Sequence, residues 1–179
     1  MRRIFTSIIL TMLLLSNITF ANPQQVELNE SYSVEQTRAA ANSHFTDDVD
    51  FYSTMQRGED PNDYVRRYFT VNLEDWILCV DQNEQGNICA VSMIVPDSTN
   101  SMALSTIGDV LLTIAIGVDS ENYSWSSKEM HLIWTARNNA MKNGHGIFYC
   151  EDTQRFYRLV VNHDMINSRW YFWVKAYVD

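Results

Sequence analysis

The C-terminal segment 169–178 constrains the fold more than any other part of this sequence, because nearly every position carries a bulky side chain. In a β-strand, successive side chains point to opposite faces of the sheet. One face then carries Trp170, Phe172, Val174, Ala176 and Val178, and the other carries Tyr171, Trp173, Lys175 and Tyr177. We expect one face to cover the core and the other to be covered by a helix or by a partner.

Apolar runs predict further strands. The segments 76–80 and 88–93 flank seven residues of turn-forming composition and predict a hairpin. The run 110–116 is apolar on both faces and predicts a central strand. Two more strands are predicted at about 147–150 and 156–161, and the second of these is joined to the last strand by a hairpin.

Helix starts are marked by capping signals. Capping boxes are formed by Ser33 with Gln36, which begins a helix to about His44, and by Ser126 with Glu129, which begins a helix over about 127–143. Asp60-Pro61 has the composition of an N-cap followed by a first helical proline, and predicts a third helix carrying Tyr64, Tyr68 and Val71 on one side.

The length of 179 residues suits one domain, and 46% hydrophobic residues supply a sizeable core. Strands interleaved with a few helices by hairpin-length links are typical of the α+β class. We therefore expect a single α+β domain over 32–179, with a largely antiparallel sheet packed with two to three helices. A polar, flexible segment over 22–31 precedes it.

Residues 1–21 have the pattern of a secretory signal peptide. Arg2 and Arg3 precede an apolar stretch, and Thr19-Phe20-Ala21 places small residues before a cut at Asn22. Cleavage would leave 11 basic residues against 22 acidic ones, a net charge of −11. We expect a periplasmic or secreted protein without a later membrane span, and the acidity argues against nucleic-acid binding and favours basic protein partners.

The three cysteines then lie in an oxidising compartment, where disulfides form. The hairpin brings Cys79 and Cys89 near one another and favours a disulfide between them. Cys150 is left over, in the apolar run Ile147-Phe148-Tyr149-Cys150, and we expect it to be a buried thiol.

The stretch from Val110 to Val161 resembles the YbjN-type domain, whose fold is similar to that of type III secretion chaperones. The resemblance rests on a strand, a capped helix ending in Arg137-Asn138-Asn139, the run Gly146 to Asp152, and a further strand. Exported members of that group also carry a cysteine pair near a hairpin. The resemblance implies a binding or chaperone-like module and no enzymatic activity.

The residues themselves contain no diagnostic catalytic, metal-binding or cofactor-binding motif. The leading hypothesis is therefore an exported protein that binds another protein through Tyr171, Trp173 and Tyr177. An acidic inhibitor or immunity protein against a cationic envelope hydrolase is one alternative.

A small envelope hydrolase is the other alternative. Its nucleophile would be Cys150, with His145 or His163 as the base. The acidic residues Asp47, Asp48 and Asp50 lack the spacing of a calcium loop, and we expect no metal and no cofactor.

Overall fold

The computed structural model describes residues 23–28, 33–45, 50–116 and 126–178. The predicted signal peptide and the acidic residues Asp47 and Asp48 lie outside the described residues. The described elements are β1 (Gln24–Val26), α2 (Val34–His44), β2 (Gln56–Arg57), β3 (Val65–Val71), β4 (Ile77–Asn83), β5 (Ile88–Pro96), α3 (Ser101–Ile116), α4 (Ser127–Asn143), β6 (His145–Cys150), β7 (Arg155–Asp164) and β8 (Arg169–Val178).

In the described part of the chain, eight strands form one antiparallel sheet. Its order is β2-β3-β4-β5-β8-β7-β6, and β1 pairs with the end of β8. Two meanders, β2 to β5 and β6 to β8, are joined where β5 lies beside β8. The predicted α+β class with a single, largely antiparallel sheet is thus confirmed.

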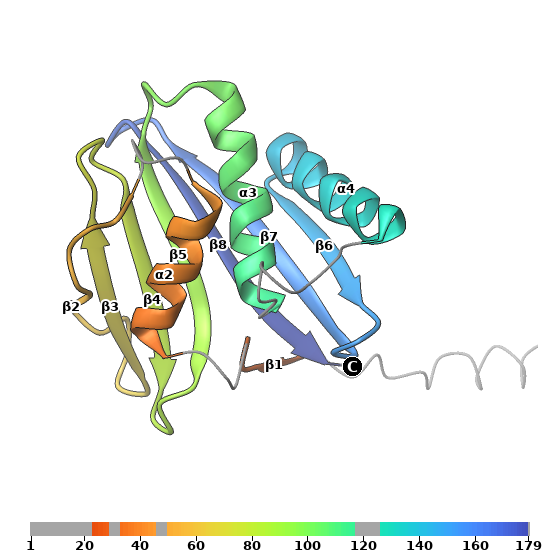
Figure 1. The fold of residues 1–179 in the computed structure, drawn as a ribbon, viewed down its shortest axis with the longest axis horizontal. Helices are drawn as coiled ribbons and strands as arrows, with labels where there is room; N and C mark the ends of the chain where they lie inside the picture. The colour runs from red at the N-terminus through yellow and green to blue at the C-terminus, as the bar shows by residue number, and fades with distance from the viewer. Residues whose placement is uncertain (1–22, 29–32, 46–49, 117–125, 179) are drawn as a thin grey trace, which may run out of the picture.

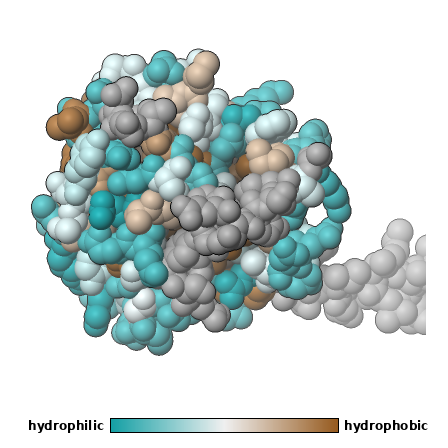
Figure 2. All heavy atoms as spheres, in the orientation of Figure 1, coloured by the Kyte–Doolittle hydropathy of each residue, from teal (hydrophilic) through white to brown (hydrophobic). Residues whose placement is uncertain are grey.

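The three described helices, α2, α3 and α4, cover the same face of the sheet (Figure 1). Figure 2, in the same orientation, shows that the coloured surface on this side, formed by the described residues, is mostly hydrophilic. The opposite face of the sheet carries no helix from the described residues, and we call it the open face. None of the described helices combines the length and hydropathy needed to cross a membrane.

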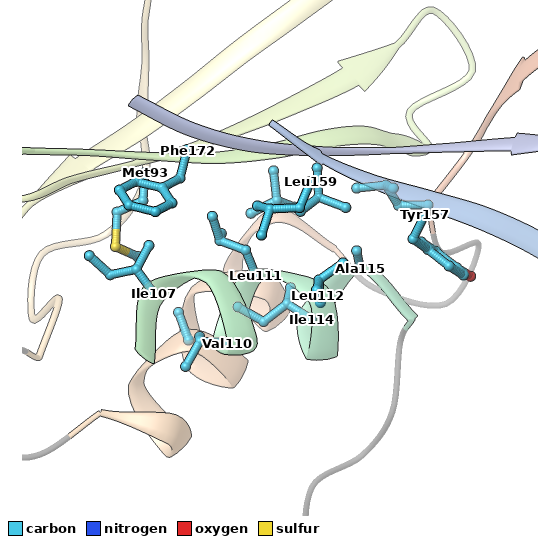
Figure 3. Packing of buried hydrophobic residues seen from close by; sticks show 14 of the residues in the cluster. Met93, Ile107, Val110, Leu111, Leu112, Ile114, Ala115, Tyr157, Leu159 and Phe172 are labelled. Carbon is cyan, nitrogen blue, oxygen red and sulfur yellow. The ribbon is translucent and has the colours of Figure 1, made fainter. Parts of the chain in front are cut away.

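The core is centred on α3, which is buried along most of its length. Its side chains pack under β5, β7 and β8, against Met93, Leu159 and Phe172 (Figure 3). The predicted central strand over 110–116 is wrong, because this run forms the last turns of α3. A helix enclosed on all sides is apolar all round, so its periodicity does not distinguish it from a buried strand.

Both predicted capping boxes are confirmed. Ser33 and Gln36 exchange side-chain and backbone hydrogen bonds at the start of α2, and Ser126 and Glu129 do the same at the start of α4. Gly144 ends α4 with a φ of 82°, a left-handed conformation that glycine adopts without a steric penalty.

The helix predicted after Asp60-Pro61 is wrong. Residues 65–71 form β3, paired along its whole length with β4. Asp60 does accept a backbone hydrogen bond, but from Arg67 in β3 and not from a first helical turn. Cross-strand pairing with β4 therefore overrides a local helix-start signal.

Part of the N-terminal segment predicted to be flexible is ordered by the sheet. Gln24–Val26 pairs with β8 as β1, and Leu28 is fully buried with its N–H bonded to the carbonyl of Ile88. The open edge of β8 beyond the end of β5 provides the hydrogen-bonding groups that hold this segment.

A half-buried charged pair lies between α3 and α4. Arg137 Nη1 lies 3.3 Å from Asp109 Oδ2, while Asp109 Oδ1 and Arg137 Nε are buried with no hydrogen-bond partner among the described residues. Burial raises the pKa of the Asp109 carboxyl from 3.8 to about 6, and Arg137 only partly opposes this shift. The ionised carboxylate is therefore costly at this position.

We predict that Asp109→Asn raises the free energy of unfolding at pH 7.5 by about 1–2 kcal/mol. The raised pKa means that the folded chain holds the proton more tightly than the unfolded chain. The stabilising contribution of Asp109 is thus full below pH 3.8 and is lost as the pH rises through about 6. Asparagine resembles the neutral carboxyl, so the gain should vanish near pH 4 and grow towards pH 7.5.

Urea titrations of the wild type and the variant between pH 4 and 7.5 measure this difference. Glu84→Gln, at an exposed turn, is the matched control and should show no such pH-dependent gain. A loss of stability in Asp109→Asn at pH 7.5 would mean that the ion pair with Arg137 outweighs the burial of the charge.

Candidate functional site

The open face of the sheet is lined by the alternate residues of its central strands. In β8 these are Tyr171, Trp173, Lys175 and Tyr177, all half-buried, while Phe172, Val174 and Ala176 are completely buried on the helix side. The two faces predicted for this strand are thus the observed ones. The helical layer does not cover the face that carries the aromatic residues.

A hollow of about 320 Å³ is formed on the open face where β3, β4, β5 and β8 run side by side. Tyr171 and Trp173 line its wall, and Arg67, Asp81 and Lys175 supply its charged groups. Tyr177, the third predicted binding residue, lies farther along β8 beside Gln25 and Phe156 and does not line the hollow.

An ion pair lies within the hollow. Arg67 donates two parallel hydrogen bonds to Asp81, from Nε to Oδ1 at 2.7 Å and from Nη2 to Oδ2 at 2.8 Å. Asp81 is 8% exposed, and its carboxylate raises the pKa of the Arg67 guanidinium. Because Arg67 lies opposite Asp81 in the sheet, the strand register itself brings the two groups together.

The ion pair is part of a polar row that crosses the open face. On β5, the residue opposite Asp81 is Ala90. Because Val91 pairs with Val174, the next residue of β8, Lys175, lies beside Ala90 and continues the row. Arg158 lies opposite Lys175 on β7 and is exposed. Three cations and one carboxylate thus give this row a local positive charge on a chain whose formal net charge is −9.

The predicted hairpin of β4 and β5 is present, but its register disfavours the predicted Cys79–Cys89 disulfide. Cys79 lies opposite Ser92, which is three residues from Cys89 and so roughly 10 Å away along the strand. A disulfide requires Cα atoms within about 7 Å. The three cysteines are buried free thiols, and burial raises the pKa of Cys79 and of Cys89.

Cys150 is buried in the core at 3% exposure, as predicted for a structural thiol. His145 is exposed on the other face of the same strand, five residues and about 16 Å away. His163 is eight residues along β7 from Arg155, the partner of Cys150, a separation of about 26 Å. Neither histidine can act as a base for this thiol in the described structure.

The sequence-based prediction missed the ion pair in the hollow. Arg67 is recognisable in the sequence only as half of a basic doublet, and Asp81 only as a turn residue. Had 65–71 been recognised as a strand paired with 77–83, the register would have placed both residues on one face. Within the described ranges, His, Cys, Asp and Glu side chains form no group of three that could hold a metal ion.

Comparison with known proteins gives no match: no protein-family model, curated protein or solved structure is similar to this chain. Aromatic walls around a fixed charged pair are suited to recognising a ligand, because the wall supplies apolar contact area and the charges orient what binds.

We predict that alkylation of the denatured, unreduced protein adds three labels per chain, since all three cysteines are free thiols. Under native conditions each should react at least about tenfold more slowly, because burial limits access and the raised pKa of Cys79 and Cys89 lowers their thiolate fraction. Mass spectrometry after timed labelling measures both quantities.

A Glu84→Cys variant, with the new thiol at an exposed turn, is the control for fast native labelling. A single label in the denatured protein would instead establish a disulfide, and peptide mapping of that bridge to Cys79 and Cys89 would require a different register for the β4–β5 hairpin.

Proposed function

We propose that this chain is an exported, non-enzymatic protein-binding or chaperone-like accessory protein that docks a segment of its partner on the open face of the sheet. The observation that carries the proposal is the placement of all three described helices on one face. The aromatic residues of β8 remain accessible on the other face.

The chemistry of Tyr171 and Trp173 supports this role. Tyrosine and tryptophan supply large contact areas at low conformational cost and dominate the energetics of many interfaces. In this protein they border a hollow, so a bound side chain would be enclosed by the wall and desolvated. These aromatic residues are also pre-organised for binding, because β8 is held between β5 and β7 in the sheet before a partner binds.

The polar row on the open face favours a partner segment that carries a negative charge. The side-chain ammonium of Lys175 donates one hydrogen bond among the described residues, to Gln25 Oε1 at 3.3 Å, and Arg158 is exposed beside it. A carboxylate of the partner placed over this row would meet two cations. The acidity of the whole chain acts differently, because it attracts basic proteins over longer distances.

Export rests on the leader pattern of residues 1–21 and places the protein in the periplasm or outside the cell. In that setting a binding role needs neither a cofactor nor a catalytic centre. The competing hydrolase hypothesis is weakened by the separation of Cys150 from His145 and His163 on the described strands.

We predict that Trp173→Ala and Tyr177→Ala each reduce the affinity for the partner by at least about fivefold, because an aromatic anchor at an interface is worth more than about 1 kcal/mol. The measurement is a quantitative pull-down from envelope extract with the tagged exported chain, comparing wild type and variants side by side. Thermal unfolding of each variant verifies that the fold is retained.

Leu73→Ala is the matched control, since Leu73 is an apolar residue 87% exposed at the β3–β4 turn, away from the open face. A specific partner should be kept by this variant. Equal recovery of every captured protein by wild type, Trp173→Ala and Tyr177→Ala would remove the open face as the binding surface.

A further inference from the structure

The four most exposed large apolar side chains among the described residues come from three connections between elements. They are Leu73 in the β3–β4 turn, Met102 at the start of α3, and Met165 and Ile166 in the β7–β8 turn, with exposures from 79% to 94%. A single exposed apolar residue is ordinary at a protein surface, whereas a group of them marks an interaction site.

These connections meet at one end of the sheet (Figure 1). We call this end the turn end, and it consists of the segments 72–76, 97–102 and 163–169. Strand register brings the segments together, because Pro96 at the end of β5 lies opposite Arg169 at the start of β8. Arg169 donates a hydrogen bond from Nη1 to the carbonyl oxygen of Asp75 at 3.0 Å, and the N–H of Asp97 donates one to the carbonyl of Ser168 at 3.1 Å.

The turn end is held in a fixed shape. In each segment an Asn or Asp side chain accepts a hydrogen bond from a nearby backbone N–H: Asn72 from Trp76, Asn100 from Ala103, and Asp164 from Ile166. His163 Nε2 lies 2.6 Å from Asp97 Oδ1, and the His163 ring stacks on Trp170 with the ring centroids 4.1 Å apart. The apolar side chains are therefore held outward before a partner binds, which lowers the entropic cost of association.

A hollow of about 250 Å³ lies between the first two segments. Glu74 and Trp76 line it from the β3–β4 turn, and Ala103 lines it from the start of α3. Leu73 and Met102 precede two of these residues in the chain, so exposed apolar residues flank the hollow. The turn end thus combines projecting apolar side chains with a recess, a relief that a partner protein can match in shape.

The turn end is also negatively charged. Its three segments contain four acidic residues and two basic ones: Glu74, Asp75, Asp97 and Asp164 against His163 and Arg169. An anionic bilayer or a second copy of this acidic chain would bring like charges together at this surface. A protein that presents lysine and arginine around an apolar recess would instead meet opposite charge around the projecting residues.

We propose that the turn end docks a basic protein. An apolar recess of that protein receives Ile166 and Leu73, and its lysine and arginine side chains meet the surrounding carboxylates. The turn end is separate from the open face, so the two surfaces hold different partners, and this inference does not rest on the proposed binding role of Trp173.

Selection of random peptides displayed on phage against the tagged exported chain tests the proposal, with the recovered peptides as the probe. We expect these peptides to be rich in lysine and arginine next to apolar residues, and their affinity should fall as the salt concentration rises. Ile166→Ser and Leu73→Ala should each weaken their binding at least about fivefold, because each removes an apolar anchor of the interface.

Ile147→Ser is the matched control, since Ile147 is 57% exposed on β6. It pairs with Arg158, which lies six residues and about 20 Å along β7 from Asp164. This variant and Trp173→Ala should bind the peptides as the wild type does. Peptides that are lost with Trp173→Ala but kept by Ile166→Ser, peptides rich in acidic residues, or a failure to recover any binding peptide would overturn the proposal.

Co-sedimentation with vesicles of phosphatidylethanolamine, with and without phosphatidylglycerol, tests a lipid surface as the other occupant. We expect the protein to stay in the supernatant with both kinds of vesicle, because the carboxylates at the turn end oppose contact with anionic lipid. Vesicle binding that Ile166→Ser abolishes would overturn the proposal and assign the turn end to a bilayer.

Discussion

The burial of α3 is the constraint on which the rest of the structure depends. Ten of its residues are buried, including the unbroken run from Val110 to Ile116. A helix with this composition needs apolar neighbours on every side. The sheet covers one side, and α2 and α4 pack beside it, so the described helices gather on one face (Figure 1). The open face is a consequence of this arrangement.

The same burial explains why the charged pair between α3 and α4 is energetically unfavourable. α4 contacts α3 through Arg137, whose side chain also lies against Gly108, and the carboxylate of Asp109 is enclosed in that contact. On the open face, by contrast, the Arg67–Asp81 pair is bidentate and its carboxylate is nearly buried. The Asp109–Arg137 pair leaves two buried polar atoms without hydrogen bonds at a helix contact. The Arg67–Asp81 pair is instead held by two hydrogen bonds, in a hollow that a ligand can enter.

Local signals in the sequence predicted local structure well. The capping boxes at Ser33 and Ser126 and the alternation in 169–178 act over a few residues, and the structure confirms each. The secondary-structure predictions failed where contacts with other elements determine the conformation of a segment. The run 110–116 is helical because other elements enclose it, and 65–71 is a strand because β4 pairs with it.

In the candidate site, too, features set by local alternation were predicted and features set by strand register were not. Tyr171 and Trp173 were predicted on the outward face from alternation alone, and they line the hollow. The ion pair of Arg67 with Asp81 depends on the register of two strands, and so does the separation of Cys79 from Cys89. Register is set by tertiary packing and turn geometry, which a single sequence does not reveal.

If the open face is the binding surface of this protein, its aromatic side chains lose solvent exposure when the partner binds. Hydroxyl-radical footprinting of the complex with the captured partner tests it most directly, because oxidation reports the exposure of each aromatic side chain. Oxidation of Tyr171 and Trp173 should fall on binding, while that of Trp134, exposed on α4, should stay unchanged. Protection of Trp134 with unchanged oxidation of Tyr171 and Trp173 would instead place the partner on the helical layer and exclude the open face as its binding surface.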